Sequence, residues 1–240
     1  MGTRFLVAVG ALLLTAAAPA PTVDEIVARN VAARGGKPAL SAVRTVRMTG
    51  RALGGPGREA IVRREVARPG RIRTEFVFQG TTGVYVWDGT TGSRVSPLDG
   101  SLEAEPLPAE AAALSAEQAD LDGPLVDWRS KGHSVELVGS AALPGGAAHE
   151  LKVTLETGVV RRLFVDAATG QVVKTTSTRT VRGHETEFET LYGDYRETGG
   201  VSFPRSIEIG ARGRPQRMRI VVESVELNPK IDDARFALPR

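Results

Sequence analysis

Residues 191–209 read LYGDYRETGGVSFPRSIEI, and this stretch decides how the second half of the chain folds. It contains five polar side chains that an enzyme can use: Tyr192, Asp194, Tyr195, Arg196 and Glu197. Side chains of an extended strand alternate between its two faces, so the even-numbered residues are predicted to face one way and the odd-numbered ones the other. Thr198, Gly199 and Gly200 suit a turn, and Pro204, which lacks an N–H, suits a bulge or an edge position. The stretch is therefore predicted to be a β-hairpin and not an active-site loop.

The same period of two residues continues on both sides of this hairpin. The connections between the predicted strands are short and rich in Gly and Pro, which predicts that successive strands pair in an antiparallel way. Open twisted sheets of more than about 10 strands tend to curl. The predicted fold class is mainly β (α+β): a half-open antiparallel β-barrel of about 11 strands, with helices covering the concave face. The predicted strands are residues 45–53, 59–68, 71–79, 83–88, 93–98, 133–143, 149–157, 159–166, 171–181, 185–197, 201–210 and 217–227.

Two parts of the chain depart from this strand pattern. After residue 21 the sequence has a helical period, and Thr22 with Glu25 three residues later forms a capping box. The Gly35-Gly36 pair is predicted to end this helix, and a helical turn is expected to follow over residues 37–43. Residues 101–128 are acidic and rich in Ala, so a helical insertion is predicted there.

The first 20 residues form a segment of their own. A basic start at Arg4 is followed by an uncharged apolar run and then by small residues, which is the pattern of a secretory signal peptide. The run is shorter than the roughly 20 apolar residues of a membrane-spanning helix. Cleavage is predicted after Ala17, giving a product that begins at Ala18, in the periplasm; an uncleaved N-terminal anchor is the alternative. Residues 21–240 are predicted to form one domain.

Composition excludes several classes of protein. The chain has 240 residues, 41% hydrophobic and 25% charged, which is typical of a globular protein. Arg outnumbers Lys by 26 to 5, but the Arg residues are scattered along the strands, which speaks against a nucleic-acid-binding stripe. There is no Cys, so neither disulfides nor a lipid-modified N-terminal Cys are expected.

Motifs for catalysis or metal binding are missing from the sequence. The three His residues, at 133, 149 and 184, lie at separate strand starts without zinc-ligand spacing. No G-x-S-x-G nucleophile elbow is present. Asp232 and Asp233 are adjacent in the C-terminal tail and are interpreted as a local cap. No catalytic residue, metal or cofactor is therefore predicted.

Apolar rows on the strands are the main candidate site. A large curled sheet with few helices is expected to leave a cavity, and apolar cavities bind apolar ligands. Ordinary core packing is the alternative for each residue. The predicted cavity wall consists of Ile72, Phe76 and Phe78, of Leu151, Val153 and Leu155, of Leu163 and Val165, and of Met218, Ile220 and Val222.

Several segments, in order along the chain, resemble the LolA/LppX/RseB-like superfamily, in particular bacterial outer membrane lipoprotein-sorting proteins. They are ARGG at 33–36 with VRTVRMTGR at 43–51, GPLVDWRSKGHSVELVG at 123–139 with HELKVTLETGVVRRLFVDAATGQVVK at 149–174, YGDYRETGGVSFPRSIEI at 192–209, and VVESVELNPKIDDARFALP at 221–239. These are mostly turns and strand cores, so they indicate a fold and no site residues.

The resemblance implies a periplasmic half-barrel whose cavity holds acyl chains of a lipoprotein or another lipid. A carrier of this kind takes its client from an inner-membrane transporter to an outer-membrane receptor without chemistry. Two alternatives stay open: a lipid- or lipoprotein-sensing regulatory module, and an envelope enzyme. A regulator is expected to bring a second domain, and only 13 residues follow the last predicted strand, which favours the carrier, expected to be a monomer.

Overall fold

A computed structural model describes residues 20–55, 57–181 and 183–238. The predicted signal peptide therefore lies outside the described residues, apart from Ala20. The helices are α1 (Val23–Ala33), α2 (Gly36–Ala42), α3 (Ala109–Gln118) and two 3₁₀ turns, η1 (Pro97–Asp99) and η2 (Asp233–Phe236). The strands are β1 (Thr45–Leu53), β2 (Glu59–Ala67), β3 (Arg71–Phe78), β4 (Thr81–Trp87), β5 (Gly92–Ser96), β6 (Ser101–Pro106), β7 (Ser134–Leu143), β8 (Gly146–Thr154), β9 (Val160–Asp166), β10 (Val172–Val181), β11 (His184–Thr198), β12 (Val201–Ala211) and β13 (Met218–Leu227).

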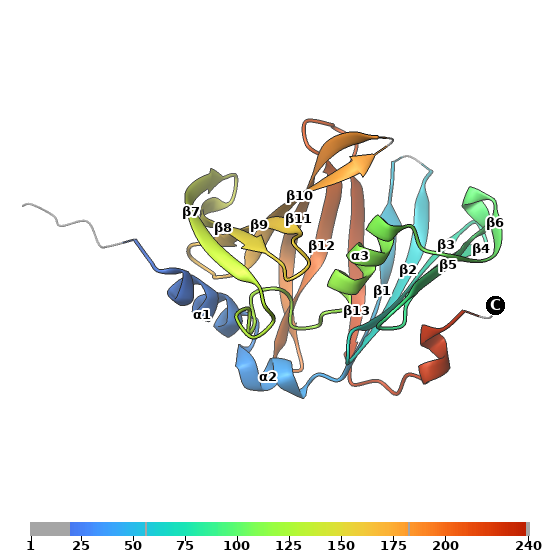
Figure 1. Ribbon diagram of the computed structural model, residues 1–240, viewed down its shortest axis with the longest axis horizontal. Helices are drawn as coiled ribbons and strands as arrows, with labels where there is room; N and C mark the ends of the chain where they lie inside the picture. The colour runs from blue at the N-terminus through green and yellow to red at the C-terminus, as the bar shows by residue number, and fades with distance from the viewer. Residues whose placement is uncertain (1–19, 56, 182, 239–240) are drawn as a thin grey trace, which may run out of the picture.

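All 13 strands belong to one antiparallel sheet in the order β6-β5-β4-β3-β2-β1-β13-β12-β11-β10-β9-β8-β7. The first and last strands of the chain, β1 and β13, pair at its centre. The edge strands β6 and β7 are not paired with each other, so the sheet curls without closing (Figure 1). The predicted half-open antiparallel barrel with helices on its concave side is confirmed.

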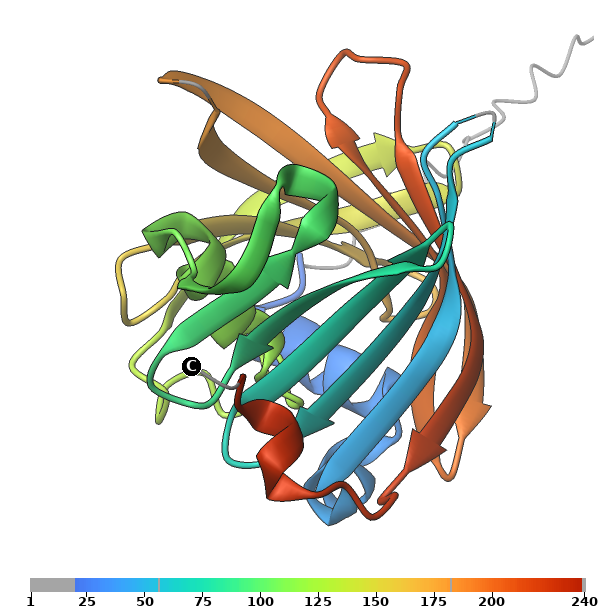
Figure 2. The same cartoon turned by 90° about the vertical axis from the view of Figure 1, so that its right-hand side faces the viewer.

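The chain between the two edge strands crosses the open side of this half-barrel. It leaves β6, forms α3, and then reaches β7 at the other edge. Helix α3 packs against β3, β4 and β5, and in Figure 2 it lies on the open side of the curled sheet. Helices α1 and α2 pack against β7 and β12 respectively.

One predicted boundary is wrong. Residues 101–106, which were assigned to the helical insertion, form β6, and the helix begins only at Ala109. Gly100, with φ 85°, turns the chain back, and Arg94 of β5 pairs with Glu105 of β6 at 2.6 Å. Pairing with a neighbouring strand thus overrides local helix propensity, as tertiary context commonly does.

The hairpin predicted from residues 191–209 is confirmed as β11 and β12, joined at Gly199 and Gly200. Its turn docks onto the junction between α1 and α2. The amide of Ser202 donates to the carbonyl oxygen of Arg34 at 3.1 Å. A Cβ on Gly35 would lie 2.0 Å from the carbonyl oxygen of Gly200, so this close approach requires glycine at position 35.

The strict alternation predicted along this hairpin is wrong. Tyr192 and Tyr195 both line a pocket on the concave side, whereas Asp194 and Arg196 are exposed and pair with each other at 2.9 Å. Asp194 has φ 50°, a left-handed conformation that interrupts the extended backbone between the two tyrosines. The interruption brings two side chains three positions apart to the same face.

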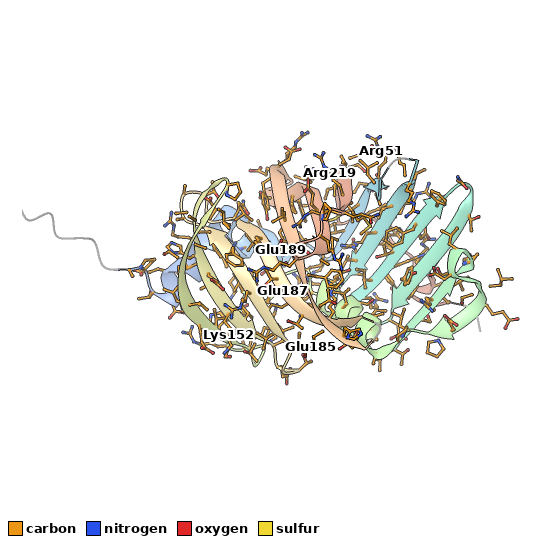
Figure 3. The ribbon with its side chains drawn as sticks, turned by 90° about the horizontal axis from the view of Figure 1, so that it is seen from above. Arg51, Lys152, Glu185, Glu187, Glu189 and Arg219 are labelled. Atoms are coloured by element: carbon orange, nitrogen blue, oxygen red, sulfur yellow. The ribbon has the colours of Figure 1, made fainter. Side chains whose placement is uncertain are left out.

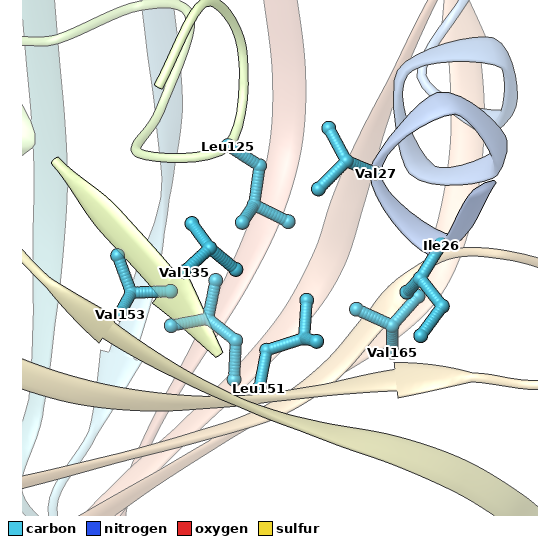
Figure 4. Packing of buried hydrophobic residues seen from close by; sticks show 8 residues of the cluster. Ile26, Val27, Leu125, Val135, Leu151, Val153 and Val165 are labelled. Carbon is cyan, nitrogen blue, oxygen red and sulfur yellow. The ribbon is translucent and has the colours of Figure 1, made fainter. Parts of the chain in front are cut away.

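Helix α1 covers one end of the concave face. Its predicted capping box is present: the Glu25 amide donates to Thr22 Oγ1 at 3.3 Å and the Thr22 amide donates to Glu25 Oε2 at 2.7 Å. The apolar face of the helix packs on β7, β8 and β9 in a cluster of Ile26, Val27, Leu125, Val135, Leu151, Val153, Leu163 and Val165 (Figure 4).

The outer face of the sheet is charged. Figure 3 labels Arg51 of β1, Glu187 of β11 and Arg219 of β13. Arg51 pairs with Glu223 at 2.6 Å and Glu187 pairs with Arg212 at 2.8 Å. The C-terminal tail also packs here, because Phe236 is 2% exposed beside Ala67 and Val86. Asp232 caps η2 by accepting from the Ala234 amide at 2.9 Å, so the predicted local cap is confirmed.

Candidate functional site

The residues predicted to form the cavity wall fall into three groups in the structure. Leu151, Val153, Leu163 and Val165 are at most 4% exposed and pack beneath α1. Phe76, Met218, Ile220 and Val222 form a second cluster at the centre of the sheet. Ile72 packs against Val66 and Ala119, near α3. Leu155 borders the first group and also lines a cleft. Phe78 is half-buried at the end of β3 and joins none of these clusters.

A cleft of about 860 Å³ lies beside α3. Its volume is within the range of roughly 300–1,000 Å³ that is typical of small-molecule sites. Its exposed surface is mostly apolar, since α3 and the chain after it contribute Ala113, Ala116 and Ala119, but charged side chains such as Arg68 and Lys131 also line it. The turns after β2 and β8 and the C-terminal tail complete the wall.

An inner pocket of about 330 Å³ lies on the other side of the same segment. Leu114, Leu121, Leu125, Leu163 and Phe203 supply apolar surface, and Tyr192 and Tyr195 supply phenols. Burial raises the pKa of both phenols, so both are neutral at physiological pH. The Tyr195 hydroxyl donates to the carbonyl oxygen of Val172 at 2.5 Å, which fixes this ring.

The cleft and the inner pocket share the wall residues Glu117, Asp120, Leu121, Pro124 and Arg161. We call residues 117–124 the partition, because this segment separates the two spaces. It is the part of the molecule that decides whether they form two cavities or one channel.

Basic side chains from both arms of the sheet hold the partition. Arg68, next to the end of β2, forms two bonds of 2.6 Å with Asp122. Arg161 of β9 pairs with Glu117 at 2.7 Å. The hydrogen bonds from Arg68 hold the pKa of the Asp122 carboxyl below its ordinary value.

Two further cations bind the same segment. Lys131 pairs with Asp120 at 2.5 Å and also donates to the carbonyl oxygen of Gly123. Arg34, at the end of α1, donates to the carbonyl oxygens of Leu121 and Asp122. Burial lowers the pKa of the Arg34 guanidinium. The partition is therefore held by four cationic side chains, Arg34, Arg68, Lys131 and Arg161.

Sequence analysis missed both the partition and its anchors. Charged residues 40 or more positions apart, such as Arg68 with Asp122 at 54 and Arg161 with Glu117 at 44, leave no local pattern. The Ala-rich run from residue 109 was the one available signal, since a helix of small side chains cannot fill the space beneath it.

The described residues contain no group of three or more His, Asp or Glu side chains placed to hold a metal ion. Among the same residues, no helix is both long and apolar enough to cross a membrane.

Comparison with known proteins identifies the fold. No family model matches the chain, and no curated protein matches its sequence. Among solved structures, a domain from Vibrio parahaemolyticus described as an outer membrane lipoprotein-sorting protein domain has a TM-score of 0.58 at 10% identity, covering 90% of this chain and 97% of its own. A LolA superfamily protein from Nitrosomonas europaea has a TM-score of 0.57 at 13% identity, covering 91% and 99% respectively. The chain thus has a LolA-type fold, as its sequence resemblance implied.

Proposed function

We propose that this protein is a periplasmic carrier that binds the acyl chains of a lipoprotein or another lipid without covalent chemistry. The observation that carries the proposal is the cleft of about 860 Å³, whose exposed surface is mostly apolar although charged side chains also line it. The apolar part of this surface suits a flexible hydrocarbon, and the charged side chains Arg68, Lys131 and Arg161 are held in ion pairs with carboxylates of residues 117–122. The Vibrio parahaemolyticus domain, which has the same fold and is described as a lipoprotein-sorting domain, supports this choice of ligand.

The free energy of binding is consistent with transport and not with storage. A 16-carbon chain gains on the order of 10 kcal/mol when it leaves water, at about 0.8 kcal/mol for each buried methylene group. A bilayer offers the same gain, so the net preference between protein and membrane is small. Such a ligand is loaded by one partner and released to another. We propose an inner-membrane transporter and an outer-membrane receptor, with export directed by residues 1–20.

Lipid analysis of the purified mature protein tests the proposal. The protein is expressed with its signal, recovered from the periplasm and extracted with organic solvent, and the extract is analysed by mass spectrometry. We expect acyl lipid or acylated peptide in stoichiometric amount. Delipidated protein is expected to bind a fluorescent fatty acyl probe, and the outer-face variant Glu187→Lys is expected to bind it equally well. Folded protein that contains no lipid and binds no probe would falsify the proposal.

A further inference from the structure

The polar interior of the half-barrel has an excess of positive charge. The acidic residues lining the inner pocket, Glu117 and Asp120, are both neutralised, by Arg161 and Lys131. Three arginines on the same side have no carboxylate partner within the described ranges 20–55, 57–181 and 183–238: Arg34, Arg64 and Arg179. Arg34 is occupied by the carbonyl oxygens of the partition. Arg64 and Arg179 therefore remain for a ligand.

Arg64 lies at the centre of the concave face. It stands on β2, opposite Met48 of β1 and Thr74 of β3. Its side chain lines a small cavity together with Val62, Ile207 and Ile220, so it reaches across the centre of the sheet to β12. Its Nε is buried, and Arg64 has no hydrogen-bond or ion-pair partner in the described part of the chain. Burial lowers the pKa of this guanidinium, because an uncompensated charge in an apolar site is costly.

Arg179 and Tyr192 line the inner pocket, whereas the cavity that Arg64 lines is a separate space of about 30 Å³. The guanidinium of Arg179 lies over the ring of Phe188, 4.8 Å from its centroid, and makes no ion pair with any described residue. Tyr192 pairs with Ile207, a wall residue of the cavity beside Arg64. The Tyr192 hydroxyl lies 3.4 Å from Thr175 Oγ1, a long contact that a charged ligand oxygen at a shorter distance can replace.

We propose that Arg64, Arg179 and Tyr192 form a binding site for the anionic head group of an amphiphile, either a carboxylate or a phosphate monoester. This inference rests on the proposed function, since it assigns the head group of the lipid whose chain the cavities would hold. Guanidinium groups and a phenol are donors that suit carboxylate and phosphate oxygens. Apolar residues of the inner pocket, among them Leu121, Leu163 and Phe203, offer surface for the first methylene groups of the tail.

The charge balance selects an anion over a neutral head group. An ester or an alcohol would satisfy a donor but would leave the positive charge of Arg64 buried. An anion neutralises that charge and forms charge-assisted hydrogen bonds, which are about twice as strong as neutral ones. The site therefore discriminates between a fatty acid and its methyl ester, although their tails are identical.

The test compares a fluorescent polyene fatty acid with its methyl ester on delipidated protein at pH 7.5. Wild-type protein is expected to bind the acid at least about tenfold more tightly than the ester, which corresponds to 1.4 kcal/mol. Arg64→Gln is expected to remove this difference by lowering the affinity for the acid and not for the ester. Arg63→Gln is the matched control, because Arg63 is exposed on the neighbouring position of the same strand. Competition by dodecyl phosphate against the fatty acid distinguishes the two anions: displacement by phosphate at tenfold lower concentration assigns a phosphate site.

Further variants and an unfolding measurement distinguish a loss of binding from a folding defect. Arg179→Gln and Tyr192→Phe are each expected to weaken binding of the acid by a smaller factor than Arg64→Gln. Both are expected to leave binding of the ester unchanged. Arg64→Gln removes a buried charge, so the variant without ligand is expected to be at least as stable as wild type in urea unfolding. Equal binding of acid and ester by wild type, with no change in Arg64→Gln, overturns the anionic site and leaves the proposed carrier intact. Binding of neither probe contradicts the carrier itself.

Discussion

Helices α1 and α3 face the same concave sheet with different side chains. Helix α1 presents Val23, Ile26, Val27 and Val31 to strands β7–β9, and Ile26 is 1% exposed. Helix α3 has the sequence AEAAALSAEQ and contains no buried residue. Large branched side chains fill the space under α1, whereas Ala methyl groups leave space under α3. We call the two regions the closed end and the open end of the half-barrel.

The difference shows that the volume of the covering side chains, and not the sheet, decides between core and cavity. Strands at both ends present apolar rows inward. Protein interiors pack to a density near that of organic crystals, so an unfilled space of several hundred Å³ is unusual in a dry core. At the open end this space is bordered by the partition with its four cationic anchors. The open end is thus the region where cavities remain in place of close packing.

The largest effect is expected from a cavity at the closed end. Leu151 is 0% exposed beneath α1, so Leu151→Ala is expected to lower the free energy of unfolding by about 2–5 kcal/mol. Urea denaturation followed by circular dichroism measures the change. Leu102→Ala, at a residue that is 77% exposed, is expected to stay within about 0.5 kcal/mol. A loss below about 1 kcal/mol for Leu151→Ala would mean that the closed end is not close-packed.

The partition is expected to give the next largest effect. Asp122→Asn removes the charge that Arg68 binds through two bonds of 2.6 Å. We expect a loss of about 1–3 kcal/mol at pH 7, since hydrogen bonds to charged groups contribute on this scale. Urea unfolding measures it, and Asp127→Asn, at an exposed pair with Lys37, serves as the control with a smaller loss. Equal losses in the two variants would remove the distinction between the partition and a surface ion pair.

The same pair predicts a dependence on pH. Hydrogen bonding by Arg68 lowers the pKa of Asp122 below its ordinary value of 3.8. A carboxyl whose pKa is lower in the folded state stabilises the fold above its unfolded pKa and loses this contribution as the pH falls. The stability difference between wild type and Asp122→Asn is therefore expected to shrink from pH 5 towards roughly pH 2. A difference that is constant over this range would contradict the assigned role of the carboxylate.

Filling the open end is expected to affect binding more than stability. Ala116 lines the cleft, so Ala116→Phe is expected to weaken a fluorescent acyl probe by about tenfold, or 1.4 kcal/mol. Unfolding free energy is expected to change by less than about 1 kcal/mol, because the new ring enters existing space. Ala109→Phe, on the exposed start of the same helix, is the control. Unchanged probe affinity in Ala116→Phe would place acyl binding elsewhere.

The smallest effect is expected at the exposed pair on the outside of β11. Arg196→Ala removes an ion pair with Asp194 whose partners are 67% and 49% exposed, and we expect a loss of at most about 0.5 kcal/mol. Asp194→Ala is expected to cost about 1 kcal/mol more than Asp194→Gly, because φ is 50° and glycine adopts this conformation without strain. Thermal or urea unfolding measures the stability of Asp194→Ala and of Asp194→Gly. If Ala and Gly at position 194 gave equal stability, the left-handed conformation would not explain the shared face of Tyr192 and Tyr195.

The sequence alone determined most of the sheet. Predicted strand ends agree with the structure to within about three residues for 12 of the 13 strands, since a period of two and the chemistry of tight turns are local properties. That Leu151 and Val153 share one face, as do Ile220 and Val222, followed from the same alternation. Strand β6 was missed because Ser101–Pro106 is extended only through its pairing with β5.

Only the tertiary structure decided which parts of these rows are core and which border a cavity. Leu151 and Ile220 are both inward-facing aliphatic residues, but the former lies under the branched side chains of α1 and the latter beside the unpartnered guanidinium of Arg64. The partition and the convergence of Arg64 with Tyr192 join residues far apart in the chain. A sequence specifies the face of a side chain through backbone geometry within a few residues, whereas the partner across the interior is set by how the whole sheet curls.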